Sequence, residues 1–229
     1  MLLEERYSNY MKKRTKTLSG SGLTLTEVEP LTKNQLLAFE SEKNLVLHGL
    51  AGTGKTFISC YLAFDDIVKG LYHNLIIIRS AVPTRDMGFL PGNEKEKSAV
   101  YEEPYKNIAI ELFGRGDAYE ILKTKGLVHF MTTSFIRGVT LQDAVILIDE
   151  CQNMSFHELD SIITRVGMNC RVIFSGDFRQ ADLFKNGLKD FIKVLKAMDK
   201  FDLIDFEIKD IVRSDFVKEY IIAKTDLGM

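Results

Sequence analysis

The sequence has few cysteines and no long apolar run, and each absence excludes a class of protein. Only three cysteines occur among 229 residues, without a C-x-x-C pair, and the four histidines are equally scattered. A disulfide framework or a zinc site is therefore not expected, and we interpret these seven residues as packing or surface residues. No run reaches the roughly 18 apolar residues of a membrane span, and the polar start lacks an apolar signal segment. We expect a cytoplasmic protein with no membrane partner.

An excess of charge of one sign is also missing. Thirty Lys plus Arg stand against 32 Asp plus Glu, so the formal net charge is −2. A polyanion would have to meet a local basic patch, because the global field supplies no attraction. Nucleic acid is neither demanded nor excluded by this balance. A single domain of this size cannot hold two nucleotide-binding lobes of roughly 150 residues each, which excludes a monomeric two-lobe motor.

The chain divides into a polar start and a patterned remainder. Residues 1–24 are polar, carry the cations Lys12, Lys13, Arg14 and Lys16, and end in a Ser/Gly-rich stretch. We predict a solvated N-terminal tail or arm there, with a nucleic-acid-binding arm as the alternative. Residues 25–229 are predicted to form a single domain.

Short apolar runs alternate with amphipathic stretches along this domain. Such runs are typical of strands that are buried on both faces, and the alternation predicts right-handed β-α-β units. The expected fold is therefore α/β, with a mostly parallel sheet, helices on both faces and ligands at the carboxyl ends of the strands. Strands are predicted at 45–47, 75–78, 127–131, 144–148, 171–174 and 201–206, and helices at 57–68, 105–113, 155–163, 188–195 and from Asp215 through 223. A capping box at 155–158 is expected to open the third of these helices, and Asp215 to cap the last.

A phosphate-binding loop stands directly after the first of these strands. Residues 49–56 read G-x-x-x-x-G-K-T and precede a predicted helix, which is the context that this motif requires. The glycines let backbone N–H groups turn toward phosphate oxygens, and the helix adds the positive end of its dipole. Lys55 is expected to reach the β- and γ-phosphates, and the Thr56 hydroxyl to bind Mg²⁺. The residues expected to contact the nucleotide here are Gly49, Ala51, Gly52, Thr53, Gly54, Lys55, Thr56 and Phe57.

Two adjacent carboxylates end a second strand. Asp149 and Glu150 follow the apolar run at 144–148, so we expect Asp149 to hold Mg²⁺ and Glu150 to polarise the attacking water. We expect these carboxylates and the phosphate loop to end neighbouring strands. A kinase of a small metabolite needs no water-activating carboxylate, so hydrolysis is favoured over group transfer. Gln180, after the next strand, can report on the γ-phosphate.

The ordered set of motifs resembles the PhoH-like family, single-domain relatives of superfamily 1 helicase motor domains. The similarity extends over most of the chain. It is carried by Gln35, residues 49–56, 88–92 with 94–97, 135–141, 149–153, Gly176-Asp177 with Gln180, and 210–213.

This resemblance implies an ATPase with a RecA-like core that acts on RNA or DNA and works as a ring, suggested to be a hexamer. It implies that Gln35 reads adenine, although Thr32 to Gln35 also satisfies the sequence of a helix capping box. Arg213 would be the arginine finger, acting across a ring interface or within its own chain. Its alternative is a surface arginine paired with Asp210 or Asp215.

Three arginines are candidates for contact with a nucleic acid. In helicase-like folds, segments after the strands beside the phosphate loop face the polymer, so Arg79, Arg85 and Arg137 are candidates to neutralise phosphates there. Ordinary surface charge is the alternative. A switch or scaffold that uses ATP to change its affinity for a protein partner fits the nearly neutral charge equally well.

Overall fold

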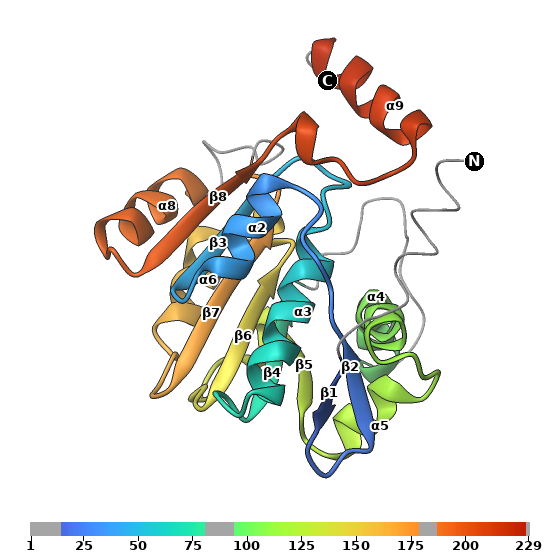
Figure 1. Ribbon diagram of the computed structural model, residues 1–229. Helices are drawn as coiled ribbons and strands as arrows, with labels where there is room; N and C mark the ends of the chain where they lie inside the picture. Colours follow the sequence, from blue (N-terminus) through green and yellow to red (C-terminus); the bar gives the residue numbers. More distant parts are fainter. Residues whose placement is uncertain (1–14, 81–93, 179–186, 228–229) are drawn as a thin grey trace, which may run out of the picture.

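A six-stranded parallel sheet forms the centre of the computed structural model, which describes residues 15–80, 94–178 and 187–227. Every strand pair in this sheet is parallel. All six predicted strands are present, and their order across the sheet is β5-β4-β6-β7-β3-β8 (Figure 1). Their bounds are β3 Asn44–Gly49, β4 Asn74–Arg79, β5 Val128–Thr132, β6 Ala144–Asp149, β7 Cys170–Gly176 and β8 Phe201–Phe206.

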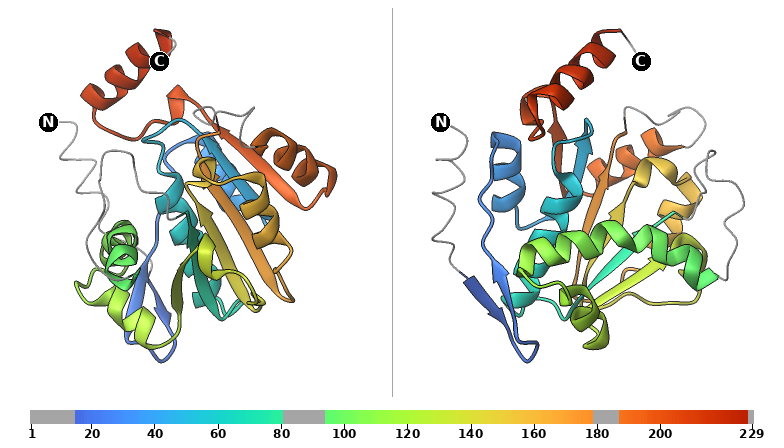
Figure 2. Two further views of the ribbon diagram at one scale, coloured as in Figure 1. Left: turned by 180° about the vertical axis from the view of Figure 1, so that it is seen from behind. Right: turned by 90° about the vertical axis from the view of Figure 1, so that its right-hand side faces the viewer.

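Helices cover both faces of the sheet, which confirms the predicted α/β class. One core contains Leu45 and Leu47 of β3 together with residues of the first group of helices, and the other contains Val46 of the same strand. Neighbouring residues of a strand point to opposite faces, so a strand covered on both sides is apolar throughout. The first face is covered by α2 Lys33–Glu40, α3 Lys55–Val68, α4 Glu94–Phe113 and α5 Ala118–Thr124, the second by α6 Phe156–Ile163 and α8 Leu188–Ala197 (Figures 1 and 2).

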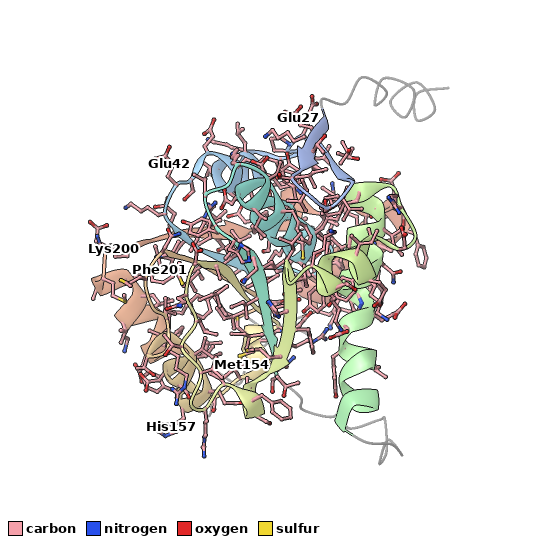
Figure 3. All side chains as sticks on the ribbon, turned by 90° about the horizontal axis from the view of Figure 1, so that it is seen from below. Glu27, Glu42, Met154, His157, Lys200 and Phe201 are labelled. Atoms are coloured by element: carbon pink, nitrogen blue, oxygen red, sulfur yellow. The ribbon has the colours of Figure 1, made fainter. Side chains whose placement is uncertain are left out.

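The predicted start of α6 is confirmed. Ser155 accepts a hydrogen bond from the backbone of Glu158, and the Glu158 side chain accepts one from the backbone of Ser155, a complete capping box. Just before this helix the chain turns from the interior to the surface. Met154 is fully buried while His157 is exposed, and Figure 3 shows His157 at the outer edge of the molecule.

An antiparallel hairpin replaces the last part of the predicted N-terminal tail. It pairs β1 Thr15–Leu18 with β2 Leu23–Thr26, and its three leucines, Leu18, Leu23 and Leu25, are buried in the core that contains α3 and α4. Lys16, expected to be solvated, lies 2.6 Å from Asp65 of α3. A tail through residue 24 is therefore wrong for residues 15–24, because the alternating leucines give the hairpin one apolar face to bury. Residues 1–14 lie outside the described ranges.

A buried ion pair links the start of β7 to helix α3. Arg171 at the start of β7 lies 2.7 Å from Asp66 of α3, and neither side chain is more than 8% exposed. The Arg171 guanidinium also donates to the carbonyls of Ser41 and Lys43, which lead into β3. Because all these partners are polar and close, the buried charge is compensated.

The chain ends in a helix that stands away from the sheet. After η3, Ile208–Asp210, helix α9 runs over Asp215–Asp226 with no buried residue, and both ribbon views show it projecting from the domain (Figures 1 and 2). Its N-cap is Ser214, so the prediction that Asp215 caps this helix is wrong by one residue. Two further 3-10 turns are η1 Thr133–Phe135 and η2 Cys151–Asn153. Within the described ranges, no helix is both long and apolar enough to cross a membrane.

Candidate nucleotide site

A cavity of about 750 Å³ opens at the carboxyl ends of the strands. Its wall contains Lys55 and Thr56 from the phosphate loop and Asp149 and Glu150 from the end of β6. The expectation that β3 and β6 are neighbours is wrong, because β7 lies between them. The two halves of the site nevertheless meet, since the loop after β3 and the first turn of α3 reach across the end of β7. The Thr56 hydroxyl lies 3.1 Å from Asp149 Oδ1.

The phosphate loop is shaped by glycine backbone conformations. Gly49 has φ +127°, and a Cβ at this position would lie 2.1 Å from the carbonyl oxygen of Phe206 in β8. Gly54 has φ +83° and immediately precedes α3, whose first residue is Lys55. Both conformations are strained for residues with a Cβ, so the glycines let the loop curl tightly beneath the start of the helix. The positive end of the α3 dipole therefore points at the cavity.

The Lys55 ammonium lies inside this curl. It donates to the carbonyls of Gly49 and Leu50 at 2.9 and 2.7 Å. Burial lowers the pKa of Lys55, and the carboxylates of Asp177, Glu150 and Asp149 oppose this shift. A phosphate oxygen that replaced these carbonyls would give the buried ammonium a full negative charge as its partner.

Thr56, Asp149 and Tyr105 form the part of the site suited to a metal ion. Asp149 is 2% exposed; its carboxylate accepts from the Thr56 hydroxyl and, at Oδ2, from the Tyr105 hydroxyl at 2.8 Å. Burial raises the pKa of Tyr105 well above its ordinary value, and the charge of Asp149 adds to the shift, so the phenol remains a donor. A hydroxyl and a carboxylate beside a phosphate loop are the hard oxygen ligands that Mg²⁺ takes together with phosphates and water. The donor set fits this ion.

No protein-only metal cage was found: among the described residues, no group of three or more His, Cys, Asp or Glu side chains is arranged to hold an ion. Mg²⁺ is usually bound by one or two carboxylates plus substrate oxygens, so a site shared with nucleotide phosphates needs no such group.

Glu150 is held by a residue two positions further along the chain. Its backbone is left-handed, with φ +52°, which is uncommon for a residue other than glycine. The Gln152 amide donates to Glu150 Oε2, and Gln152 Oε1 accepts from the backbone N–H of Asp177 at 3.0 Å. This bridge needs glycine at 176, since a Cβ there would lie 2.4 Å from Gln152 Oε1. Gln152 thus links the predicted catalytic carboxylate to the end of β7.

Gln35 also lines the cavity, beside the phosphate loop, and is 4% exposed. Thr32 caps α2 by accepting from the Gln35 N–H, as the predicted capping box requires. The Gln35 side chain departs from that box, because its Oε1 accepts from Leu31 N–H and its Nε2 donates to Thr53 O. Each end of the amide keeps one further hydrogen-bonding position. The adenine contact stays a prediction, and the structure adds a second role, since Gln35 ties α2 to the phosphate loop.

Arg213 lies against the phosphate loop of its own chain. The Val212 N–H donates to Gly52 O at 3.1 Å, and a Cβ on Gly52 would lie 3.0 Å from Arg213 Cγ. Both Val212 and Arg213 line the cavity. Asp210 anchors this segment, since its carboxylate accepts from the Asn34 amide at 2.7 Å. The arrangement places the predicted arginine finger beside the nucleotide site in cis.

The structure describes two of the three arginines that we predicted to contact nucleic acid. Arg79, at the end of β4, lines the nucleotide cavity itself, and its guanidinium lies 5.7 Å from the centre of the Tyr101 ring. Arg137 is exposed after η1, beyond β5 at the far edge of the sheet, and is not part of the cavity wall. Arg85 and the predicted γ-phosphate sensor Gln180 both lie outside the described residues.

Sequence reasoning missed the contribution of α4. Pro104 and Ile108 line the cavity and Tyr105 contacts Asp149, whereas the apolar spacing at 105–113 predicts packing alone. Nothing in that spacing marks the tyrosine as polar in function, because a buried aromatic fits the same helical face. For Gln152 a signal existed: it stands two residues after Glu150, within the quoted motif at 149–153.

The chain is similar in sequence to known proteins. The sequence profile of the family described as PhoH-like protein matches residues 27–224. A PhoH-like protein of Bacillus subtilis (strain 168) is 31% identical over 226 residues, which cover 96% of this chain and 70% of the relative. Protein PhoH of Escherichia coli (strain K12) is 32% identical over 184 residues, with 78% of this chain and 52% of the relative covered.

The fold recurs in solved structures. The large terminase from a thermophilic bacteriophage, in complex with ADP, matches with a TM-score of 0.56 at 14% identity. The match covers 83% of this chain and 49% of the terminase chain. The predicted RecA-like core of P-loop NTPases is confirmed at the level of fold.

Proposed function

The chain belongs to the PhoH-like protein family, and on this basis we propose that it binds ATP and hydrolyses it with the help of Mg²⁺. The observation that carries the proposal is the convergence of Lys55, Thr56, Asp149 and Glu150 on one cavity. Cation, hydroxyl, metal-binding carboxylate and second carboxylate are the groups that hydrolysis of a nucleoside triphosphate requires.

Each of these residues has a distinct role. Lys55 exchanges its two carbonyl partners for oxygens of the β- and γ-phosphates, while the start of α3 stabilises their charge. Thr56 and Asp149 would hold Mg²⁺, which would supply positive charge to neutralise the phosphate oxygens. Glu150 orients the attacking water and accepts its proton, and Gln152 keeps that carboxylate in place. Arg213 adds positive charge from its own chain.

Two substitutions test these roles separately. Lys55→Ala is expected to abolish nucleotide binding, whereas Glu150→Gln is expected to retain binding and to lower turnover by about 10²–10⁴-fold, the usual contribution of a general base. The matched controls are the exposed residues Lys196 and Glu42, changed in the same way. The measurements are the dissociation constant of a fluorescent ATP analogue and the rate of phosphate release. A Glu150→Gln variant as active as its parent would overturn the catalytic assignment.

We propose single-stranded RNA or DNA as the partner and a homo-oligomeric ring, hexameric as the family resemblance suggests, as the working form. The chain covers 70% and 52% of the two relatives described above. ATPase stimulation by an added single strand is the expected result. Charge reversal at Arg137 should weaken strand binding and flatten its salt dependence, because each lost phosphate contact reduces counterion release. Hydrolysis that no nucleic acid stimulates would favour the ATP-dependent switch for a protein partner.

The role of Arg213 in such a ring has its own test. Lys55→Ala and Arg213→Ala variants are each expected to be inactive. When they are mixed, an arginine that acts in trans restores some activity, since some interfaces then combine an intact loop with an intact arginine. An arginine that acts in cis restores none, which is the expected result because Arg213 lies beside its own Gly52. A parent chain that stays monomeric in light scattering while fully active would contradict the ring.

A further inference from the structure

We propose that Tyr105 is a positioning residue for the metal ion: its hydroxyl fixes the orientation of Asp149 and thereby sets the affinity of the site for Mg²⁺. The inference rests on the proposed function and names a residue on helix α4, far in sequence from both nucleotide motifs. The contact joins residues that are 44 positions apart.

The geometry around the Asp149 carboxylate supports this role of Tyr105. Asp149 is 2% exposed and Tyr105 is also 2% exposed, so water does not compete for the hydrogen bond between them. Tyr105 binds Oδ2 at 2.8 Å, whereas the Thr56 hydroxyl lies 3.1 Å from Oδ1 and 3.3 Å from Oδ2. The shortest of these three contacts is therefore the one from the Tyr105 hydroxyl. It anchors one carboxylate oxygen, and rotation of the carboxylate about its terminal bond, which is otherwise soft, is restricted.

A metal-binding carboxylate needs hydrogen-bonding support from its neighbours. Ligating carboxylates are themselves hydrogen-bonded by a surrounding layer of residues, which sets their direction and their charge. Tyr105 supplies such a contact, since its hydroxyl donates to Asp149 Oδ2 at 2.8 Å. Oδ2 is therefore held in place, while Oδ1 accepts from the Thr56 hydroxyl at the cavity wall.

The helix that carries the tyrosine is held by packing and by an ion pair. The Tyr105 ring packs 5.8 Å from the ring of Phe130 in β5, and Glu102 of α4 lies 2.9 Å from Lys123 of α5. The same turn of α4 lines the cavity with Pro104 and Ile108. The same turn of α4 thus contacts both the metal-binding carboxylate and another part of the cavity wall.

The test is Tyr105→Phe, which removes the hydroxyl and keeps the ring. The matched control is Tyr119→Phe, because Tyr119 is also 2% exposed and its hydroxyl has no hydrogen-bond partner among the described residues. The measurement is binding of a fluorescent ATP analogue as Mg²⁺ is titrated, repeated in EDTA. We expect Tyr105→Phe to raise the half-saturating Mg²⁺ concentration about tenfold or more, in the range seen when such supporting contacts are lost, with nucleotide affinity in EDTA unchanged.

A second measurement separates positioning from packing. In an Asp149→Asn background, Tyr105→Phe should shift the Mg²⁺ midpoint no further, because its partner carboxylate is already gone; circular dichroism establishes that each variant is folded. An unchanged midpoint in Tyr105→Phe, an equal shift in Tyr119→Phe, or equal weakening in EDTA would each overturn the inference. A parent chain that binds no nucleotide would instead refute the proposed function.

Discussion

Replacing Gln152 with alanine should slow hydrolysis without weakening nucleotide binding. Gln152 donates to the Glu150 carboxylate and accepts from Asp177 N–H, so the substitution frees the carboxylate that orients the water. A hydrogen bond to a charged group contributes about 1.5–3 kcal/mol, and each ~1.4 kcal/mol is tenfold in rate. If most of this energy serves to orient Glu150 in the transition state, turnover falls about 10- to 100-fold.

The same substitution has a structural cost that can be measured separately. Asp177 is 5% exposed, so its N–H loses a partner in a buried setting, and the free energy of unfolding should fall by about 1–3 kcal/mol. Urea unfolding measures this loss, phosphate release measures turnover, and a fluorescent analogue measures affinity. The exposed Gln142, changed to alanine, is the control. Parental turnover in Gln152→Ala, or a fall in affinity that accounts for the whole loss of activity, would refute the positioning role.

Three further predictions concern stability and the shape of the loop. Asp66→Asn leaves a buried arginine without its carboxylate, so the free energy of unfolding should fall by about 3 kcal/mol in urea titrations; a loss below about 0.5 kcal/mol would show that the pair is not needed. Gly49→Ala places a Cβ 2.1 Å from a carbonyl oxygen of β8, so nucleotide binding should be lost, and parental affinity would contradict the loop geometry. Burial alone would raise the pKa of Asp65, but hydrogen bonds from Lys16 and Lys69 hold it below its ordinary value. The resulting stabilisation is present above the unfolded pKa of about 3.9 and is lost as the pH falls through the lower folded pKa, so Asp65→Asn should flatten the acid side of the stability curve; an unchanged curve would contradict this.

Much of the fold and the centre of the site could be predicted from sequence because both are encoded locally. Six mostly apolar runs marked the six strands, since a strand covered on both faces is apolar at most positions. The loop at 49–56 and the pair Asp149 and Glu150 were recognisable because each lies within a few residues of the end of its strand. The hairpin at 15–26 was missed: two four-residue strands carry too short a pattern to separate from a polar tail.

Only the tertiary structure decided how these local features meet. Sequence could not show that β7 separates β3 from β6, because strand order depends on how the connecting helices pack rather than on any one strand. The contacts of Asp149 with Thr56 and Tyr105 span 93 and 44 residues, and they exist because the loop crosses the end of β7 while α4 packs against the sheet. Arg213 likewise reaches its own phosphate loop through the backbone bond from Val212 to Gly52. The residue types alone indicated the chemistry of the site. The packing of distant elements determined which side chains support the residues that carry this chemistry.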